Sequence, residues 1–279
     1  MLTSLRHRLQ SWNRKRLERH RAAREASGAQ PATLGVLGIM KNEAFNIDEW
    51  VQHYLSVGAG KIFLIDNGST DDTVRKAQNW VARGVVELVE YPERYRQRQH
   101  YWTAFNQLKI AQKCQWLVVA DLDEFWFCPS GKPMPDQLKE FRDIDVIYGN
   151  WRMFGSNGHI THPASLRQGF TLREPHLHTH RYRKYICRTK VVKNQHSLGI
   201  HAVTGARSER TVSDNELFHL NHYPIQSLEY FQKVKMTRGD ATKSSNDLVR
   251  NMAYFQHYDA DCSQEDRLLA DLVASGKIA

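Results

Sequence analysis

Two aspartates separated by one residue, Asp121 and Asp123, are the side chains of this sequence most suited to metal chemistry. They follow an apolar run at 116–120 and precede an aromatic run at 125–127. In extended backbone, residues i and i+2 point to the same side, so both carboxylates can face one cation. Hard oxygen ligands suit Mg²⁺ or Mn²⁺, which bridge protein carboxylates to substrate phosphates. The pair therefore predicts a divalent-cation site at the end of a strand.

The same spacing occurs twice more, at Asp143/Asp145 and Asp259/Asp261, so spacing alone is a weak signal. The pair at 121 and 123 differs because it stands between a buried-type apolar run and an aromatic run. A surface coincidence is the alternative interpretation, and this context favours the metal site over it.

The elements that must position these residues follow from an alternation of patterns. Apolar runs that predict strands are 34–40, 61–65, 85–89 and 116–120. Segments with helical spacing are 47–57, 72–82 and about 101–112, and a short amphipathic helix is expected within 261–278. Such alternation is typical of an α/β fold with a mostly parallel sheet and helices on both faces. Ligands of these sheets bind beyond the carboxyl ends of the strands.

Polar residues also follow the first two predicted strands. Lys41, Asn42 and Glu43 follow the first, and a run from Asp66 to Asp71 follows the second. Neither G-x-G-x-x-G nor G-x-x-x-x-G-K-[ST] occurs, which removes the main support for a dinucleotide-binding or P-loop protein. Asp71 could simply cap the next helix, but capping does not account for acids at a second strand end.

Composition and charge indicate a globular protein. The 279 residues carry 39 Lys and Arg against 30 Asp and Glu, a net charge of +9, and 41% are hydrophobic. There is no apolar stretch long enough for a transmembrane helix and no apolar core of a secretory signal near the start. The four cysteines show no C-x-x-C spacing, so reduced thiols and a cytoplasmic location are expected.

Most of the positive charge lies at the start of the chain. Residues 1–30 hold eight basic and two acidic side chains, a net charge of +6. Leu2, Leu5, Leu9 and Trp12 recur there at helical spacing, a pattern suited to an anionic membrane surface. A solvated extension without a partner is the equal alternative. We expect a tail and linker at 1–32 and a folded domain at 33–279.

Taken together, these motifs resemble nucleotide-sugar glycosyltransferases of the GT-A fold, in the family 2-like and family 92-like group. The matching blocks are GIMKNEA at 38–44, DNGSTD at 66–71, DLDEF at 121–125, WRMFGSNGH at 151–159 and NHYPIQSLEYFQKVKMTRGDA at 221–241. The resemblance implies a nucleotide-binding half at about 33–128 and an acceptor half at about 129–279. It also implies Mn²⁺ or Mg²⁺ as cofactor.

The resemblance assigns roles residue by residue. Donor-binding residues would be Lys41, Asn42, Glu43, Asp66, Asn67, Asp71 and Asp121, with Lys233 and Arg238 meeting the leaving diphosphate. Acceptor-binding residues would be Trp151, Phe154, Ser156, Asn157 and His159. Metal ligands would be Asp121 and Asp123, joined by His201 or His222, although either histidine could equally be an ordinary hydrogen-bonded one.

An inverting transfer, which the resemblance implies, needs a carboxylate base on the acceptor hydroxyl. Glu174, Glu216 and Asp240 are candidates, and Glu174 is favoured because it follows the acceptor-side segment. The Glu-Asp base motif of family 2 has no counterpart here.

For two polar clusters, the sequence allows more than one interpretation. His176, His178 and His180 alternate and would share one face of a strand, as a metal site or as a polar loop. The basic stretch at 94–98 could bind a phosphate or a phosphorylated acceptor, or it could form a solvated turn.

We therefore expect a metal-dependent glycosyltransferase that moves a hexose from a UDP-sugar to a saccharide or lipid-linked saccharide of an envelope polysaccharide or lipopolysaccharide. It would be cytoplasmic, or peripheral on the inner face of the cytoplasmic membrane. One alternative is a nucleotidyltransferase acting on sugar phosphates, which would carry a Gly-rich basic loop after the first strand. Another is a basic membrane-binding or nucleic-acid-binding protein without enzymatic activity. Nucleic acid is not expected as a partner, because no nucleic-acid-binding signature occurs.

Overall fold

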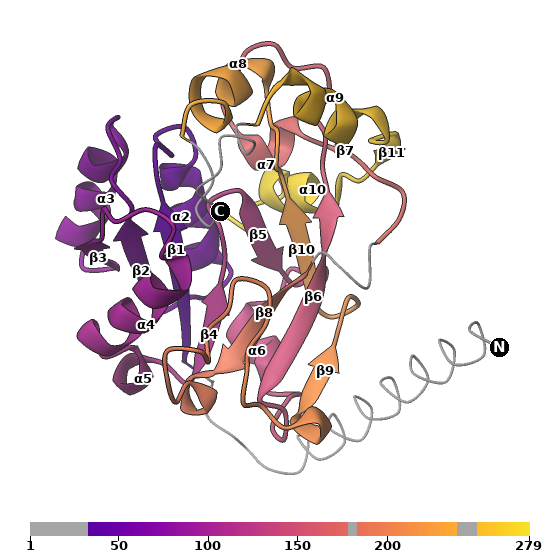
Figure 1. Cartoon of the computed structure of the whole chain (residues 1–279). Helices are drawn as coiled ribbons and strands as arrows, with labels where there is room; N and C mark the ends of the chain where they lie inside the picture. The colour runs from indigo at the N-terminus through magenta and orange to yellow at the C-terminus, as the bar shows by residue number, and fades with distance from the viewer. Residues whose placement is uncertain (1–32, 178–182, 239–249) are drawn as a thin grey trace.

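The apolar runs of the sequence form a nine-stranded sheet in the computed structural model, which describes residues 33–177, 183–238 and 250–279 (Figure 1). The strand order is β3-β2-β1-β4-β8-β6-β10-β5, and β9 pairs with β6. These strands are β1 (Leu34–Met40), β2 (Lys61–Asp66), β3 (Val86–Glu90), β4 (Trp116–Val119), β5 (Glu124–Phe127), β6 (Val146–Met153), β8 (Arg183–Arg188), β9 (Thr211–Ser213) and β10 (His219–His222). A separate small pair joins β7 (Leu172–Arg173) to β11 (Gln264–Glu265).

Most strands of the large sheet run in one direction. β1 pairs in parallel with β2 and β4, and β6 pairs in parallel with β9 and β10. Because β8 is antiparallel to both β4 and β6, those two strands point the same way. The carboxyl ends of β1, β2, β4, β6 and β10 therefore meet along one edge of the sheet.

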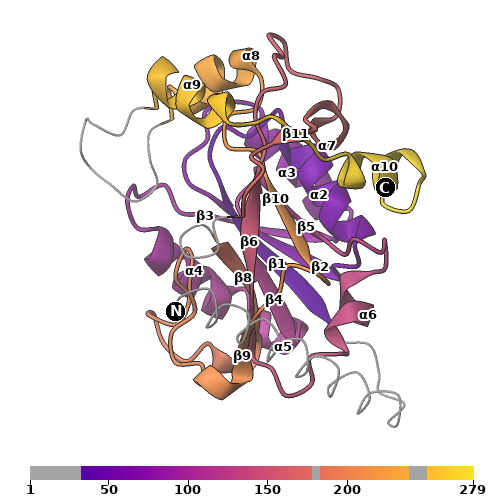
Figure 2. The same cartoon turned by 90° about the vertical axis from the view of Figure 1, so that its right-hand side faces the viewer.

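Helices cover both faces of the sheet, because successive strand residues point to opposite sides (Figure 2). Val36 and Val118 belong to the core beneath α2 (Ile47–Ser56) and α3 (Thr73–Ala82). Their neighbours Leu37 and Val119 belong to the core beneath α4 (Gln97–Gln107) and α5 (Ile110–Lys113). The remaining helical segments are α6 (Met134–Leu138), α7 (Leu166–Gly169), η1 (Thr189–Val191), η2 (Ser208–Arg210), α8 (Leu228–Tyr230), the π-helical turn η3 (Phe231–Lys235), α9 (Met252–Ala260) and α10 (Leu268–Ala274).

The predicted α/β class and mostly parallel sheet are confirmed. The four predicted strands and the first two helices lie within a few residues of their expected positions. The third helix differs: it begins at Gln97 and is divided at Lys109, where a φ of 52° interrupts the helical backbone. The helix expected within 261–278 is shorter, because residues 264–265 are extended and pair with β7 before α10 begins at Leu268.

Several predictions fall outside the described residues. They concern the membrane-binding tail at 1–30 and the side chains of His178, His180 and Asp240. In the part of the chain that is described, no helix is long and apolar enough to cross a membrane.

One face of α2 holds the main chain that follows β4. Trp50 Nε1 donates to the carbonyl oxygen of Asp121 (2.9 Å), and Tyr54 Oη donates to that of Glu124 (3.0 Å). His53 Nε2 lies 2.8 Å from the carbonyl oxygen of Trp126. Trp50, His53 and Tyr54 are fully buried, three and four residues apart on the helix, so they share one face. Helix α2 thereby fixes the loop that carries the paired aspartates.

We expect Tyr54→Phe to lower the free energy of unfolding by about 1–3 kcal/mol, because two buried main-chain groups lose a partner. The Tyr54 hydroxyl donates to Glu124 and accepts from the amide of Trp126 (3.3 Å), both in the interior. Urea denaturation measures the change. The matched control is Tyr91→Phe, whose hydroxyl makes an exposed bond to Gln107, and we expect a change within about 0.5 kcal/mol. Equal effects of the two variants would contradict this role of Tyr54.

Candidate active site

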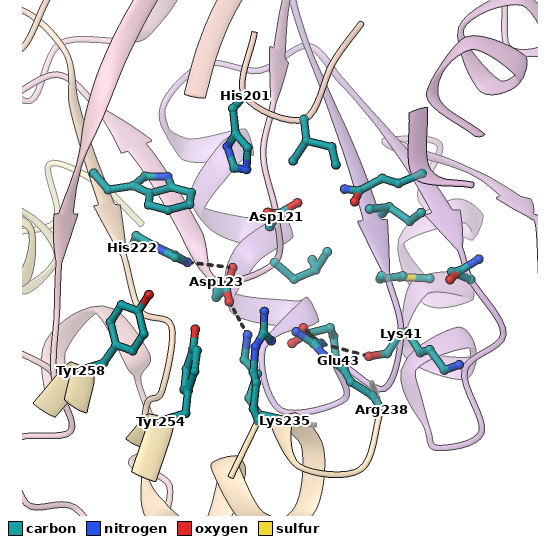
Figure 3. Close-up of a pocket in the computed structure, with 18 of the residues that line it drawn as sticks. Lys41, Glu43, Asp121, Asp123, His201, His222, Lys235, Arg238, Tyr254 and Tyr258 are labelled. Carbon is teal, nitrogen blue, oxygen red and sulfur yellow. Dashed lines mark hydrogen bonds and ion pairs between the residues drawn. The ribbon is translucent and has the colours of Figure 1, made fainter. Parts of the chain in front are cut away.

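A cavity of about 460 Å³ opens at the edge where the parallel strands end (Figure 3). Residues from the ends of β1, β4, β6 and β10 line it, together with residues from the segment before α4, from η3 and from α9. The predicted site residues among them are Lys41, Glu43, Asn67, Asp121, Asp123, Trp151, His201, His222 and Arg238. The fold thus brings nine predicted residues from both halves of the chain to one cavity.

Asp121 is paired with a fully buried lysine. Lys184 Nζ, from β8, lies 2.8 Å from Asp121 Oδ2 and 3.5 Å from Glu124 Oε2. Glu124 Oε2 also accepts the amide of Asp121 (2.9 Å), which fixes the turn between the two acids. Burial alone would lower the pKa of Lys184, but the charges of Asp121 and Glu124 outweigh it and raise that pKa above its ordinary value.

Asp123 is held by two further side chains. Lys235 Nζ contacts Asp123 Oδ2, and His222 Nε2 lies 3.6 Å from Asp123 Oδ1 (Figure 3). Burial alone would raise the pKa of Asp123, but the charge of Lys235 outweighs it and holds that pKa well below its usual range. Burial lowers the pKa of His222, which favours the neutral imidazole, the form that binds metals.

The donor set fits a divalent cation that shares its ligands with a substrate. Asp121, Asp123 and His222 offer two carboxylates and an imidazole, ligands that Mn²⁺ accepts. Within the described ranges, no group of three or more His, Cys, Asp or Glu side chains is placed so that it could hold a metal ion by itself. Mg²⁺ and its analogues are often bound by one or two carboxylates plus substrate phosphates. The residues present therefore fit a cation that a diphosphate helps to bind.

Basic side chains outnumber acidic ones around the cavity. Among the described lining residues, the basic ones are Lys41, Arg94, Lys235, Arg238 and Arg250, and the acidic ones are Glu43, Asp121 and Asp123. Arg238 pairs with Glu43 and donates to the carbonyl oxygen of Lys41 (3.1 Å). Burial and the nearby Arg94 charge lower the pKa of Lys41. The excess of positive charge favours an anionic ligand.

Three predicted donor residues shape the cavity's loops and do not line it. The Asp66 carboxylate accepts the amides of Gly68 (3.1 Å) and Ser69 (3.1 Å). Asn42 Oδ1 accepts the amide of Thr70 (2.8 Å), which ties the first strand end to the second. Asp71 Oδ1 accepts the amide of Thr73 (3.0 Å) at the start of α3, the structural role that the sequence left open.

Lys235 lines the cavity, whereas the predicted Lys233 does not. Lys233, the predicted diphosphate residue, has a side chain that is 64% exposed and pairs with Glu229 (2.7 Å). The side chain of Lys235 is 1% exposed and points at Asp123. Both lie in the π-helical turn η3, whose wider winding differs from the α-helical spacing that a sequence pattern assumes.

Of the five residues predicted to bind the acceptor, Trp151 lines the cavity and the other four do not. Phe154 is buried against Tyr223, with ring centroids 4.8 Å apart. Ser156 bonds to Asp259 of α9. The other two hold neighbouring loops: Asn157 Oδ1 accepts the amide of Leu172 (2.9 Å), and His159 Nε2 lies 2.9 Å from the carbonyl oxygen of Gly169.

Two of the candidate bases lie away from the cavity lining. Glu174 follows β7 and does not line the cavity. Burial raises the pKa of Cys262, and the charge of Glu174 raises it further. Glu216 is exposed between β9 and β10. The sequence did not indicate Lys184, Lys235, Arg250, Tyr254 or Tyr258. Of these, only Lys235 lies within one of the matching blocks, the one at 221–241. The others lie in segments whose packing against the sheet cannot be predicted from a local sequence pattern.

Fold and cavity together define an α/β protein with paired carboxylates and an excess of basic side chains at its strand ends, an arrangement that favours an anionic ligand. The chain belongs to glycosyltransferase family 92, whose model matches residues 36–264. The resemblance drawn from the motifs is thus confirmed.

Known proteins resemble this chain at low identity. A glycosyltransferase family 92 protein from Ricinus communis is 24% identical over 223 residues, which cover 77% of this chain and 39% of that protein. The chain therefore spans about two fifths of that relative's length. Among solved structures, S. aureus TarS 1–349 in complex with UDP-GlcNAc is 14% identical with a TM-score of 0.46, covering 86% of this chain and 71% of that one. GalNAc-T7 with UDP, GalNAc and Mn²⁺ is 12% identical with a TM-score of 0.41, covering 88% and 57%.

We expect Lys184→Met to lower the free energy of unfolding by about 3–5 kcal/mol, because it leaves the fully buried Glu124 and the partly buried Asp121 without their cation. Urea denaturation measures the loss. The matched control is Lys190→Met, which removes an exposed lysine 3.0 Å from Asp145, and we expect at most about 1 kcal/mol there. A loss at Lys184 no larger than in the control would show that the acids need no buried partner.

Proposed function

We propose that this protein moves a hexose from a UDP-sugar to a saccharide acceptor with the help of Mn²⁺ or Mg²⁺. The observation that carries the proposal is the cavity in which Asp121 and Asp123 face a wall of basic side chains. A diphosphate bound together with a divalent cation complements both kinds of charge. Membership of family 92 supports transfer of a sugar as the reaction.

The nucleoside would occupy the end of the cavity that Lys41, Asn67, Arg94 and Gln97 line. These residues follow the first strands of the sheet, in the half expected to bind the nucleotide. A guanidinium stacks on aromatic rings, and an amide both donates and accepts hydrogen bonds. Arg94 and Gln97 therefore suit the flat, polar uracil ring. In this interpretation Arg94 and Gln97, from the basic stretch at 94–98, contact the base of the donor and not a phosphate, which differs from both alternatives that the sequence suggests.

The transfer breaks the bond between the anomeric carbon and a diphosphate oxygen, and the acceptor oxygen bonds to that carbon as its proton leaves. Negative charge grows on the departing diphosphate, and Lys235 and Arg238 would stabilise it from the cavity wall. A divalent cation held by Asp121 and Asp123, with His222 or His201 beside them, supplies further charge stabilisation when bound.

A base must accept the proton of the acceptor hydroxyl if the reaction inverts the anomeric centre. Of Glu174, Glu216 and Asp240, Asp240 is nearest in sequence to a cavity residue, two positions after Arg238. We propose Asp240 as this base and an inverting reaction.

The acceptor would belong to an envelope polysaccharide or lipopolysaccharide, free or lipid-linked. We propose that residues 1–30 hold the enzyme at an anionic membrane surface, on the cytoplasmic side. The net charge of +6 and the Leu/Trp spacing in that segment support this.

We expect Asp123→Ala to reduce UDP-sugar hydrolysis or transfer by at least about 100-fold, because the diphosphate loses its charge stabilisation. Chelation of divalent cations is expected to have the same effect on the unaltered protein, and both are followed by release of UDP. The matched control is Asp261→Ala, from a pair with the same D-x-D spacing at an exposed position, which should leave the rate unchanged. Activity that survives chelation and Asp123→Ala would refute the role of the metal.

We expect Lys235→Met to weaken UDP binding in the presence of Mn²⁺ by at least about 10-fold, because a buried charge-assisted contact with the diphosphate is lost. Lys233→Met, two residues away and exposed, should stay within about twofold of the unaltered protein. Isothermal titration calorimetry gives both affinities. A larger loss of UDP affinity in Lys233→Met than in Lys235→Met would instead assign the diphosphate contact to Lys233.

A further inference from the structure

Two tyrosines of α9 form an aromatic wall in the cavity. Tyr254 and Tyr258 are one helical turn apart, with ring centroids 4.5 Å apart and planes tilted by 38°. They lie on the opposite side of Asp123 from Lys41 (Figure 3), and Trp151 is the third large aromatic residue of the described lining. The aromatic wall is thus separated from the nucleoside end by the paired aspartates.

This wall has a supported side and an open side. Phe231 stacks on Tyr254 with centroids 6.1 Å apart, and Phe255 packs against Phe231 at 5.1 Å. Both phenylalanines are buried, whereas Tyr254 and Tyr258 are only half-buried and border the cavity. Both tyrosines therefore pack against the hydrophobic core on one side and border the cavity on the other.

The helix that carries the tyrosines is fixed in place. The amide and hydroxyl of Ser156 donate to the carboxylate of Asp259 (2.6 Å and 2.9 Å). Asn251 Oδ1 accepts the amide of Tyr254 (3.0 Å) and caps the helix. Ser156 stands five residues after Trp151, so one segment both supplies Trp151 and anchors α9. Ser156 is therefore a positioning residue for this wall.

Such a wall suits the ring of a sugar. One face of a hexopyranose carries mainly C–H groups and its edge carries hydroxyls, while tyrosine combines an apolar ring with a polar hydroxyl. Ligand sites commonly join aromatic surfaces to a few placed polar groups. An acceptor stacked here would lie on the side of Asp123 away from the nucleoside, where the acceptor hydroxyl must approach the anomeric carbon.

We infer that Tyr254, Tyr258 and Trp151 form the acceptor subsite and that the acceptor presents a hexopyranoside ring to it. This inference rests on the proposed function, since it places the acceptor relative to the UDP-sugar.

The test is binding of methyl hexopyranosides (α- and β-glucoside, galactoside and mannoside) to the full chain loaded with UDP and Mn²⁺, by saturation-transfer NMR and titration. We expect at least one glycoside to bind, with saturation strongest on the C–H face of its ring. Tyr254→Ala should weaken it by about 10-fold, and Tyr254→Phe, which keeps the ring, by no more than about threefold. The matched control Gln256→Ala alters an exposed residue of α9 and should change nothing.

Three outcomes would overturn the inference: no glycoside binds to the loaded protein, Tyr254→Ala binds it as well as Gln256→Ala does, or Tyr254→Ala instead loses UDP. Each leaves UDP binding by the unaltered protein intact, so the proposed function survives. Failure of the unaltered protein to bind UDP with Mn²⁺ would instead refute the proposed function itself.

Discussion

Two lysines that are far apart in the sequence neutralise the acids at the end of β4, and the site depends on this charge balance. Lys184 comes from β8 and pairs with Asp121, and Lys235 comes from η3 and pairs with Asp123. Carboxylates removed from water cost several kcal/mol each unless they are paired. The loop that carries them can therefore lie inside the protein only when the second half of the chain is folded against the first. The cavity is a product of both halves.

The same charge balance would let a divalent cation replace the lysine ammonium groups beside the two aspartates, as the proposed function requires. In the protein alone, the ammonium of Lys235 satisfies Asp123. Under the proposed function, Lys235 and Arg238 would gain the diphosphate as a new anionic partner, and the carboxylates would gain the divalent cation. Meanwhile, α2 keeps the main chain of the acid loop fixed through Trp50, His53 and Tyr54. A rigid loop with exchangeable counter-charges is suited to binding donor and metal together.

The sequence predicted those parts of the site that follow from periodicity. Strand ends could be located, and with them Lys41, Glu43, Asn67 and the paired aspartates, because parallel strands deliver their carboxyl ends to one edge. Lys235 could not be separated from Lys233, because a π-helical turn changes which side chain faces inward. Lys184 and the tyrosines of α9 depend on tertiary packing that no local pattern encodes. Of the residues predicted to bind the acceptor, Trp151 lines the cavity, whereas hydrogen bonds to neighbouring loops and to α9 occupy Ser156, Asn157 and His159.

The central claim is that paired carboxylates and a diphosphate bind one divalent cation jointly. Calorimetric titration of Mn²⁺ into the protein, with and without saturating UDP, tests this most directly. We expect UDP to tighten Mn²⁺ binding by at least about 10-fold. Because such coupling is reciprocal, Mn²⁺ should tighten UDP binding by the same factor. UDP that binds equally well in the presence of a chelator would contradict it.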